Sequence, residues 1–344
     1  MTRIDHRSAG LDALRAIASF MVVAFHLRTI VKVDFGPLNP FVEGGGAGVW
    51  IFFALSGYLL YRPFVAGPVD LRAYALKRAA RILPGYYVAL VALTALTGNR
   101  LPIEHPLPYL AMFASYELPL RGFLGVAWTL AAEVLFYVSL PALAWLARGR
   151  EVAVLGALGI GSLSLALSHP ADVADPNIWV TGTFPFVFYA FVPGMLLAFA
   201  EARRSSILER LRRPTFLSLG IAYVLIGVLV GTLPGAIVPG AALVGLSTPM
   251  IMAWTLGRRV PAPRLLAFLG GASYAMYLWH WDAFNAFGIV GLPIAMAGAA
   301  LSWSLVERPI LDRARRLAST LTIRAFDWNV VLRALPASKS LRRP

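Results

Sequence analysis

Long blocks of apolar residues alternate with short basic segments along this chain. Several blocks, including residues 11–31 and 265–287, exceed the ~18 apolar residues that indicate a membrane-spanning helix. Only 14% of the 344 residues are charged, whereas about a quarter of a soluble domain is charged. The sequence therefore predicts an all-α fold, a polytopic transmembrane helical bundle.

About ten spans can be delimited by hydropathy. They cover residues 11–31, 48–65, 84–98, 126–147, 152–168, 181–200, 216–232, 237–256, 265–287 and 289–306. The segment 106–118 is too short to cross a bilayer, so we expect a re-entrant or interfacial piece there. Residues 1–310 are expected to form a single transmembrane domain, followed by a basic cytoplasmic tail at 311–344.

The basic residues give this bundle an orientation. If the N-terminus is cytoplasmic, all but four of the 31 Lys and Arg residues fall in cytoplasmic segments, the exceptions being Arg28, Lys32, Arg100 and Arg121. Positive charge concentrated in short loops on one side is the pattern that sets membrane topology. We therefore expect both termini in the cytoplasm, and the net charge of +14 does not indicate nucleic-acid binding.

Metal and thiol chemistry are not predicted. The chain has no cysteine, and its five histidines are scattered without ligand spacing. We expect no metal site and no bound cofactor.

The first span carries Arg15 near one end and His26 near the other. Eleven residues at 100° each bring both side chains to the same helix face, roughly 16 Å apart along the axis. Ionisable residues inside spans mark functional sites. The alternative is that Arg15 reaches the headgroups and His26 is a hydrogen-bonded packing residue.

Two later spans carry further polar residues. Glu133 is expected near the depth of His26, where the pair would orient the imidazole and favour its role as a general base. The alternative for Glu133 is a structural hydrogen bond between spans. Ser273, Tyr277 and His280 recur at i, i+4 and i+7, which places them on one helix face.

Basic and small residues complete the pattern. Arg78 and Arg81 lie in a predicted cytoplasmic loop and could together bind a phosphate, although membrane topology alone also explains them. The glycines of 44–48 predict close helix packing or space for a ligand. Glu307-Arg308-Pro309 is expected to end the last span at the inner surface.

Six motifs occur in an order that resembles acyltransferase family three, the multispan bacterial enzymes typified by O-antigen acetylases. They are Leu11-Asp12-Ala-Leu-Arg15 with His26, Phe52-Phe-Ala-Leu-Ser-Gly57, Arg78-Ala-Ala-Arg81-Ile-Leu-Pro84, Trp128-Thr-Leu-Ala-Ala-Glu133 with Phe136-Tyr137, Ser273-Tyr-Ala-Met-Tyr-Leu-Trp-His280 and Glu307-Arg-Pro309. Thr129 stands where the family usually has Ser. The resemblance runs from Gly10 to about Pro309.

This resemblance implies O-acylation in the bacterial inner membrane with a cytoplasmic acyl-CoA, most often acetyl-CoA, as donor substrate. It implies that Arg15 and His26 are the essential pair and that the Arg78/Arg81 motif contacts the donor. Glu133 is then expected to assist His26, and Ser273, Tyr277 or His280 to contact the oxyanion or the acceptor. Transfer could be direct or could pass through an acyl-histidine.

The acceptor would be a carbohydrate, a glycolipid or a macrolide-type hydroxyl compound. Some family members carry a fused periplasmic domain that receives the acyl group. No such domain is recognised in this sequence, so we expect the bundle itself or a separate periplasmic partner to complete transfer.

Two other functions fit polar residues in a membrane bundle. One is a transporter or flippase for a glycan or lipid-linked substrate, although no internal repeat is found. The other is a non-catalytic partner in a glycan-synthesis complex.

Overall fold

The computed structural model describes residues 6–117, 120–169, 182–256, 258 and 264–320, and every regular element within them is a helix. The longer helices are α1 (His6–Thr29), α3 (Gly48–Ala66), α4 (Leu71–Thr97), α7 (Trp128–Ala147), α8 (Glu151–Leu167), α11 (Val192–Ala202), α13 (Pro214–Val230), α14 (Ile237–Leu256), α15 (Arg264–Phe287), α16 (Gly291–Leu301) and α17 (Arg308–Thr320). Shorter elements connect them: η1 (Gly36–Leu38), α2 (Asn39–Glu43), η2 (Gly44–Ala47), α5 (Leu101–Glu104), α6 (Pro106–Leu110), η3 (Ala114–Tyr116), η5 (Gly125–Ala127), α10 (Phe184–Val187), η6 (Phe188–Ala190), α12 (Ser206–Leu211), η7 (Gly288–Val290) and the π-helix η8 (Ser302–Glu307).

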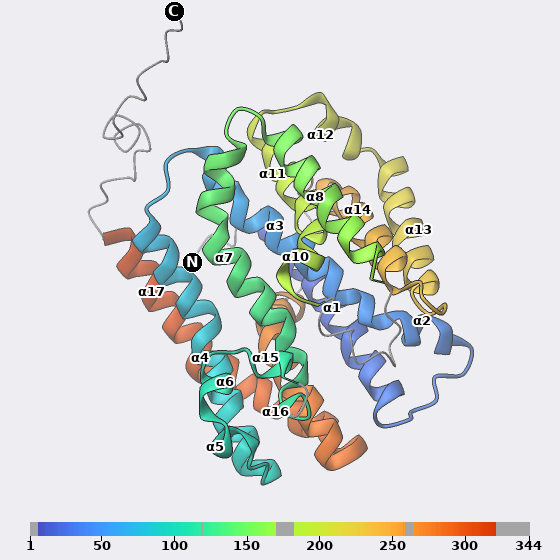
Figure 1. The fold of residues 1–344 in the computed structure, drawn as a ribbon, viewed down its shortest axis with the longest axis vertical. Helices are drawn as coiled ribbons and strands as arrows, with labels where there is room; N and C mark the ends of the chain where they lie inside the picture. The colour runs from blue at the N-terminus through green and yellow to red at the C-terminus, as the bar shows by residue number, and fades with distance from the viewer. Residues whose placement is uncertain (1–5, 118–119, 170–181, 257, 259–263, 321–344) are drawn as a thin grey trace, which may run out of the picture.

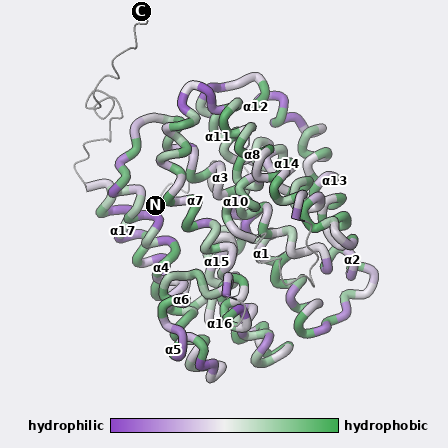
Figure 2. The backbone as a smooth tube through the Cα atoms, viewed as in Figure 1, coloured by the Kyte–Doolittle hydropathy of each residue, from purple (hydrophilic) through white to green (hydrophobic). Residues whose placement is uncertain are grey.

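These helices form one bundle, as Figure 1 shows, with α1 and α3 running through its interior. Helix α1 packs against α15, α3 and α14, and α4 packs against α15 and α17. Large apolar side chains are exposed on the outside of the bundle, including Phe20 (73% exposed) and Val138 (74%). The hydrophobic colouring of the long helices in Figure 2 agrees with lipid contact, so the chain is a multi-pass membrane protein.

The number of spans differs from the ten predicted. Six helical segments in the described residues are long and apolar enough to cross a membrane, or seven if the pair 184–190 and 192–202, bent by 44°, is one span. Two further apolar helices, α8 and α13, have 17 residues each. The last of the six segments, Leu265–Thr320, contains both α15 and α16. These two helices pack against each other. The predicted interfacial segment 106–118 forms the short elements α6 and η3 as far as residue 116.

Helix α4 begins thirteen residues before the predicted span at 84–98, so Arg78 and Arg81 lie on a helix and not in a loop. Asp70 caps it by accepting hydrogen bonds from the backbone N–H groups of Arg72 and Ala73. The residues after the cap are good helix formers. The basic residues among them lower the hydropathy, so a span predicted from hydropathy begins too late. Pro84 lies inside the helix and does not end it.

The last predicted span also continues further than expected. α16 passes into a π-helix at Ser302–Glu307 and then into α17, so Glu307-Arg308-Pro309 does not end the helical run. Most of the predicted tail, residues 321–344, lies outside the described residues.

Glycines allow the helices to approach closely at the centre of the bundle. A Cβ atom on Gly57 of α3 would overlap the carbonyl of Phe191, and one on Gly194 of α11 would overlap the carbonyl of Ala54. A Cβ atom on Gly45 or on Gly48 would likewise overlap a backbone carbonyl of α1. Such small-residue contacts are typical of membrane helix pairs, so the close packing predicted for 44–48 is confirmed.

Candidate functional site

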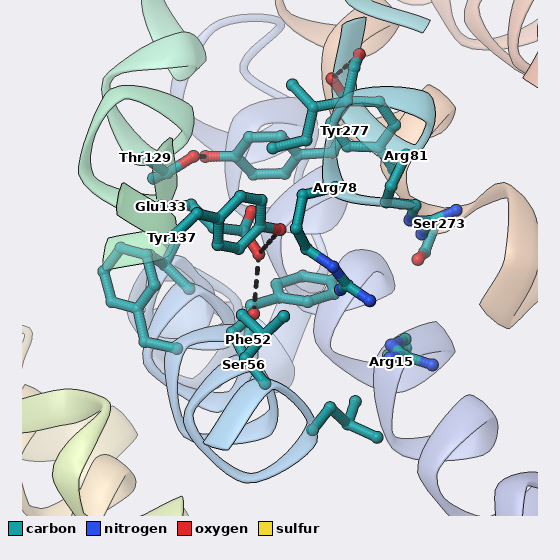
Figure 3. A pocket seen from close by; sticks show the side chains of 16 residues that line it. Arg15, Phe52, Ser56, Arg78, Arg81, Thr129, Glu133, Tyr137, Ser273 and Tyr277 are labelled. Carbon is teal, nitrogen blue, oxygen red and sulfur yellow. Dashed lines mark hydrogen bonds between the residues drawn. The ribbon is translucent and has the colours of Figure 1, made fainter. Parts of the chain in front are cut away.

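Three arginines and one glutamate converge on a cavity of about 120 Å³ inside the bundle. Arg15 comes from α1, Arg78 and Arg81 from α4, and Glu133 from α7. Figure 3 shows these side chains around the same space. We call this space the guanidinium cavity. The three arginines of the donor-binding prediction therefore lie together.

Aromatic rings hold two of the guanidinium groups in place. The Cζ atom of Arg78 lies 5.8 Å from the ring centroid of Tyr74 and 5.9 Å from that of Tyr137. The Cζ atom of Arg81 lies 5.5 Å from the ring centroid of Tyr274 and 5.6 Å from that of Trp303. Cations within about 6 Å of such rings are attracted by their π-electrons.

The charges in this cavity are not balanced. Arg15 donates to Asp12 at 2.7 Å. Within the described residues, no carboxylate lies within ion-pair distance of Arg78 or Arg81, and Nε of Arg78 is buried without a hydrogen-bond partner. Partly buried cations that lack an ion-pair partner favour the binding of an anion.

Glu133 does not form the expected pair with His26. Its Oε1 atom accepts hydrogen bonds from Ser56 Oγ at 2.8 Å and from Tyr137 Oη at 2.7 Å, as the dashed lines in Figure 3 mark. The two residues line different cavities: Glu133 lines the guanidinium cavity, whereas α7 contributes Trp128, more than one turn earlier, to the cavity that His26 lines.

His26 pairs instead with His280 of α15. Nδ1 of His26 lies 2.8 Å from Nε2 of His280, and Nδ1 of His280 lies 3.0 Å from the carbonyl oxygen of Met276. A carbonyl only accepts hydrogen bonds, so Nδ1 of a neutral His280 carries its proton and Nε2 is an acceptor. His26 then donates from Nδ1, and its Nε2 atom has a free lone pair. This assignment follows from the hydrogen-bond network.

His26 lines a second and larger cavity of about 590 Å³, which we call the His26 chamber. Its walls come from α1, α3, α8, α13, α14 and α15, together with the short elements around η2 and η6. Gly44 and Gly46 also line it, so the glycine-rich segment provides space as well as close packing. His280 is fully buried behind His26 and lines neither cavity.

Tyr277 and Val49 line both cavities and therefore lie at their junction. The Tyr277 hydroxyl is 3.1 Å from the carbonyl of Val126 and 3.1 Å from Thr129 Oγ1, which is itself 3.1 Å from the same carbonyl. Ser273 lines the guanidinium cavity, but its hydroxyl donates to the carbonyl of Gly270.

Two acidic residues near the site have contacts that were not predicted from the sequence. Glu307 is 2% exposed and accepts a hydrogen bond from Ser302 at 2.7 Å, where the sequence suggested a surface helix end. Asp282 is buried and accepts the backbone N–H of Leu124, whose φ of 48° lies in the left-handed region. Asp282 thereby anchors the segment that leads into α7. An acidic residue two positions after His280 was the available signal.

No group of three or more His, Asp or Glu side chains in the described part of the chain is arranged to hold a metal ion. The arrangement instead provides two adjoining cavities, one with cations and one with an imidazole. Such a pair suits a reaction between an anionic substrate and a second molecule.

Comparison with known proteins identifies the family of this chain. A family model described as an acyltransferase domain matches residues 8–306. The exopolysaccharide production protein ExoZ of Rhizobium meliloti is 32% identical over 310 residues, which cover 82% of this chain and 95% of that protein. Nodulation protein 10 of Rhizobium leguminosarum is 28% identical over 369 residues, covering 94% and 97%.

The peptidoglycan O-acetyltransferase OatA of Listeria monocytogenes is 27% identical over 320 residues, covering 79% of this chain and 48% of that protein. No solved structure matches the chain. The family match covers most of the chain and includes Arg15, His26, the α4 arginines and the α15 motif. The chain therefore belongs to the acyltransferase family of multi-pass membrane proteins that transfer acyl groups to hydroxyls.

Proposed function

We propose that the protein transfers an acyl group, most simply acetyl, from cytoplasmic acyl-CoA to a hydroxyl of a carbohydrate or glycan-like acceptor. The observation that carries this proposal is the junction of the two cavities at Tyr277 and Val49. A thioester bound among the guanidinium groups would meet an alcohol beside His26 there. The names of relatives concerned with exopolysaccharide production and peptidoglycan O-acetylation support a carbohydrate acceptor.

The guanidinium cavity is the proposed donor site. CoA carries several phosphate charges, and planar guanidinium groups bind phosphate through paired charge-assisted hydrogen bonds. Arg78 and Arg81 have no carboxylate partner within the described residues, so they can receive phosphate without first breaking an ion pair. Arg15 would complete the anion site from α1.

His26 is the proposed general base. Its Nε2 atom would take the proton of the acceptor hydroxyl as the oxygen attacks the thioester carbonyl. The C–S bond then breaks, the ester forms, and the imidazolium returns the proton to the departing CoA sulfur. The Tyr277 O–H would donate to the oxyanion, because Thr129 can keep the carbonyl of Val126 hydrogen-bonded when Tyr277 turns away. Glu133 would hold Ser56 and Tyr137 on the donor side.

The direction of transfer follows from the basic residues. With both termini in the cytoplasm, the arginine-rich segments face the compartment that contains acyl-CoA. We infer a location in the bacterial inner membrane, with the acceptor reaching the His26 chamber from the periplasmic side. A separate periplasmic protein could then receive or present the acceptor.

The test uses the protein in membrane vesicles with acetyl-CoA, and CoA release is followed with a thiol reagent. The chain contains no cysteine, so the reagent does not react with the protein itself. We expect His26→Ala to lower CoA release about 10²–10⁴-fold, the usual contribution of a general base. Equal release by wild type and His26→Ala at matched protein levels would overturn the proposal.

The acceptor is identified by mass spectrometry of surface glycans, lipids and secreted compounds. Cells that produce the wild type should contain one species that carries an added acetyl group. That species should be missing from cells that produce His26→Ala. If the wild type moves a glycan across vesicle membranes and forms no acyl ester, it is a transporter and the proposal is wrong.

A further inference from the structure

The His26 chamber is far larger than its share of the reaction requires. Its volume is about 590 Å³, within the ~300–1,000 Å³ typical of sites for whole small molecules. The chamber extends from His26 to Gly227 and Ala241 on α13 and α14 and to Ala166 on α8. Small side chains at these positions leave the space open. An acceptor could therefore place a substantial body there besides its reacting hydroxyl.

The walls of this chamber offer few hydrogen-bond acceptors. Its described lining contains no Asp, Asn, Gln, Ser, Lys or Arg side chain. Besides His26, its polar side-chain groups include the Thr29 hydroxyl, the Glu43 carboxylate, which pairs with Arg28 at 3.0 Å, the Tyr189 and Tyr277 hydroxyls and the Trp281 indole N–H. The Tyr189 hydroxyl and the Trp281 N–H are buried without a hydrogen-bond partner among the residues that the structure describes. A free sugar chain bound here would leave several hydroxyl groups without acceptors, which opposes binding.

The remaining walls suit an apolar ligand. Trp50 and Tyr189 stack with ring centroids 5.9 Å apart, and Trp50 also contacts Trp128 at 6.4 Å. Ile30, Ile237 and Val238 add aliphatic surface. Aromatic faces can also stack on a sugar ring, but they cannot accept the hydrogen bonds of its remaining hydroxyls.

We propose that the chamber binds an amphipathic alcohol, with its reacting hydroxyl at His26 and a largely apolar body between α8, α13 and α14. This inference rests on the proposed function and narrows its acceptor class. A glycolipid or a macrolide-type compound has this chemistry, and a free polysaccharide does not.

The test measures binding separately from turnover. Protein in lipid nanodiscs is titrated with bromooctyl β-glucoside, whose bromine quenches the tryptophans of the chamber. Ala166→Phe fills one wall, and Ala157→Phe makes the same change on an exposed face of the same helix. We expect Ala166→Phe to weaken quenching roughly tenfold, the effect of displacing a methylene or two from a pocket. Ala157→Phe should bind like the wild type. Methyl β-glucoside should not compete.

A second variant tests whether weaker probe binding could instead result from misfolding of Ala166→Phe. Ala241→Leu fills the opposite wall from α14 and should weaken quenching in the same direction. Equal quenching in folded Ala166→Phe, Ala241→Leu and Ala157→Phe would overturn the inference. So would competition by methyl β-glucoside as strong as that by the octyl compound.

CoA release in the same samples separates this inference from the proposed function. If release depends on His26 but the chamber variants bind the probe normally, only the inference fails. If the probe binds selectively but release never depends on His26, only the proposed function fails. If Ala166→Phe lowers release from octanoyl-CoA and not from acetyl-CoA, while quenching is unchanged, the chamber holds the donor's acyl chain and the inference is wrong.

Discussion

Nδ1 of His26 and Nε2 of His280 lie 2.8 Å apart, and this contact decides which nitrogen of His26 carries the proton. The carbonyl of Met276 fixes the proton of His280 on Nδ1, so His280 accepts the proton of His26. The lone pair on Nε2 of His26 is then free. In many enzymes a carboxylate orients a catalytic histidine in this way. Here a neutral imidazole would do so in an environment where a second charge is costly.

The first prediction concerns His280 as a positioning residue. His280→Leu removes the acceptor for the His26 proton, so both tautomers and several ring orientations become accessible. We expect kcat to fall about 10–100-fold, as for other residues that orient a functional histidine, with little change in the KM for acetyl-CoA. Steady-state CoA release measures both constants.

Rescue by a conservative variant tests this role against a purely structural one. His280→Gln keeps a carbonyl oxygen that can accept the His26 proton, so it should recover most of the lost kcat. Equal losses in His280→Leu and His280→Gln, with equal losses of thermal stability, would indicate that His280 only fills space.

The second prediction concerns the donor phosphates. Arg78→Met and Arg81→Met should each raise the KM for acetyl-CoA about 10–100-fold, because hydrogen bonds to charged groups contribute roughly 1.5–3 kcal/mol. The effect should vanish with acetyl-pantetheine, which lacks the phosphates. Arg72→Met makes the same change at an exposed position on the same helix and should leave the KM unchanged. An equal effect on both donors would exclude phosphate binding.

The third prediction concerns Tyr277 at the junction of the cavities. Tyr277→Phe keeps the ring and removes the proposed oxyanion donor, so kcat should fall about 10²–10³-fold. Single-turnover acyl transfer in nanodiscs measures the chemical step. Thr129→Val tests the supporting hydroxyl, which would hold the carbonyl of Val126 when Tyr277 turns away, and it should lower kcat less than Tyr277→Phe does. A kcat within a few-fold of the wild type in Tyr277→Phe would assign its hydroxyl to structure alone.

Much of the fold was predictable because membrane helices carry a strong signal. The long apolar blocks identified the all-helical bundle and most helix positions within a few residues. Charged residues near a helix end lower the hydropathy there and concealed the remaining helical residues. Helix α4 continues through Arg72, Lys77 and Arg78, because those side chains turn toward the cavity or the surface. The broken segment around Phe191 and the π-helix at Ser302–Glu307 depend on tertiary packing, which hydropathy does not report.

The sequence indicated which polar residues lie inside the bundle, but not which of them pair. Polar residues inside apolar spans are rare, so Arg15, His26, Glu133 and His280 stood out in the sequence, and their functional roles stay predictions. Their partners depend on which helices touch. The packing of α1 against α15 brings His280 to His26, while Glu133 lines the guanidinium cavity. Spacing along one helix cannot give this information about two.

The fourth prediction follows from the position of Glu133 among three cations. Glu133→Gln keeps an oxygen for the hydroxyls of Ser56 and Tyr137 but removes one negative charge from the lining of the guanidinium cavity. The empty protein should become less stable, because less negative charge then offsets the repulsion among the three arginines. CoA should bind several-fold more tightly, since the cavity gains net positive charge, and should restore the lost stability. Thermal unfolding with and without CoA measures both effects. Weaker CoA binding in Glu133→Gln would mean that the carboxylate positions the donor and that the net charge of the cavity does not set the affinity for CoA.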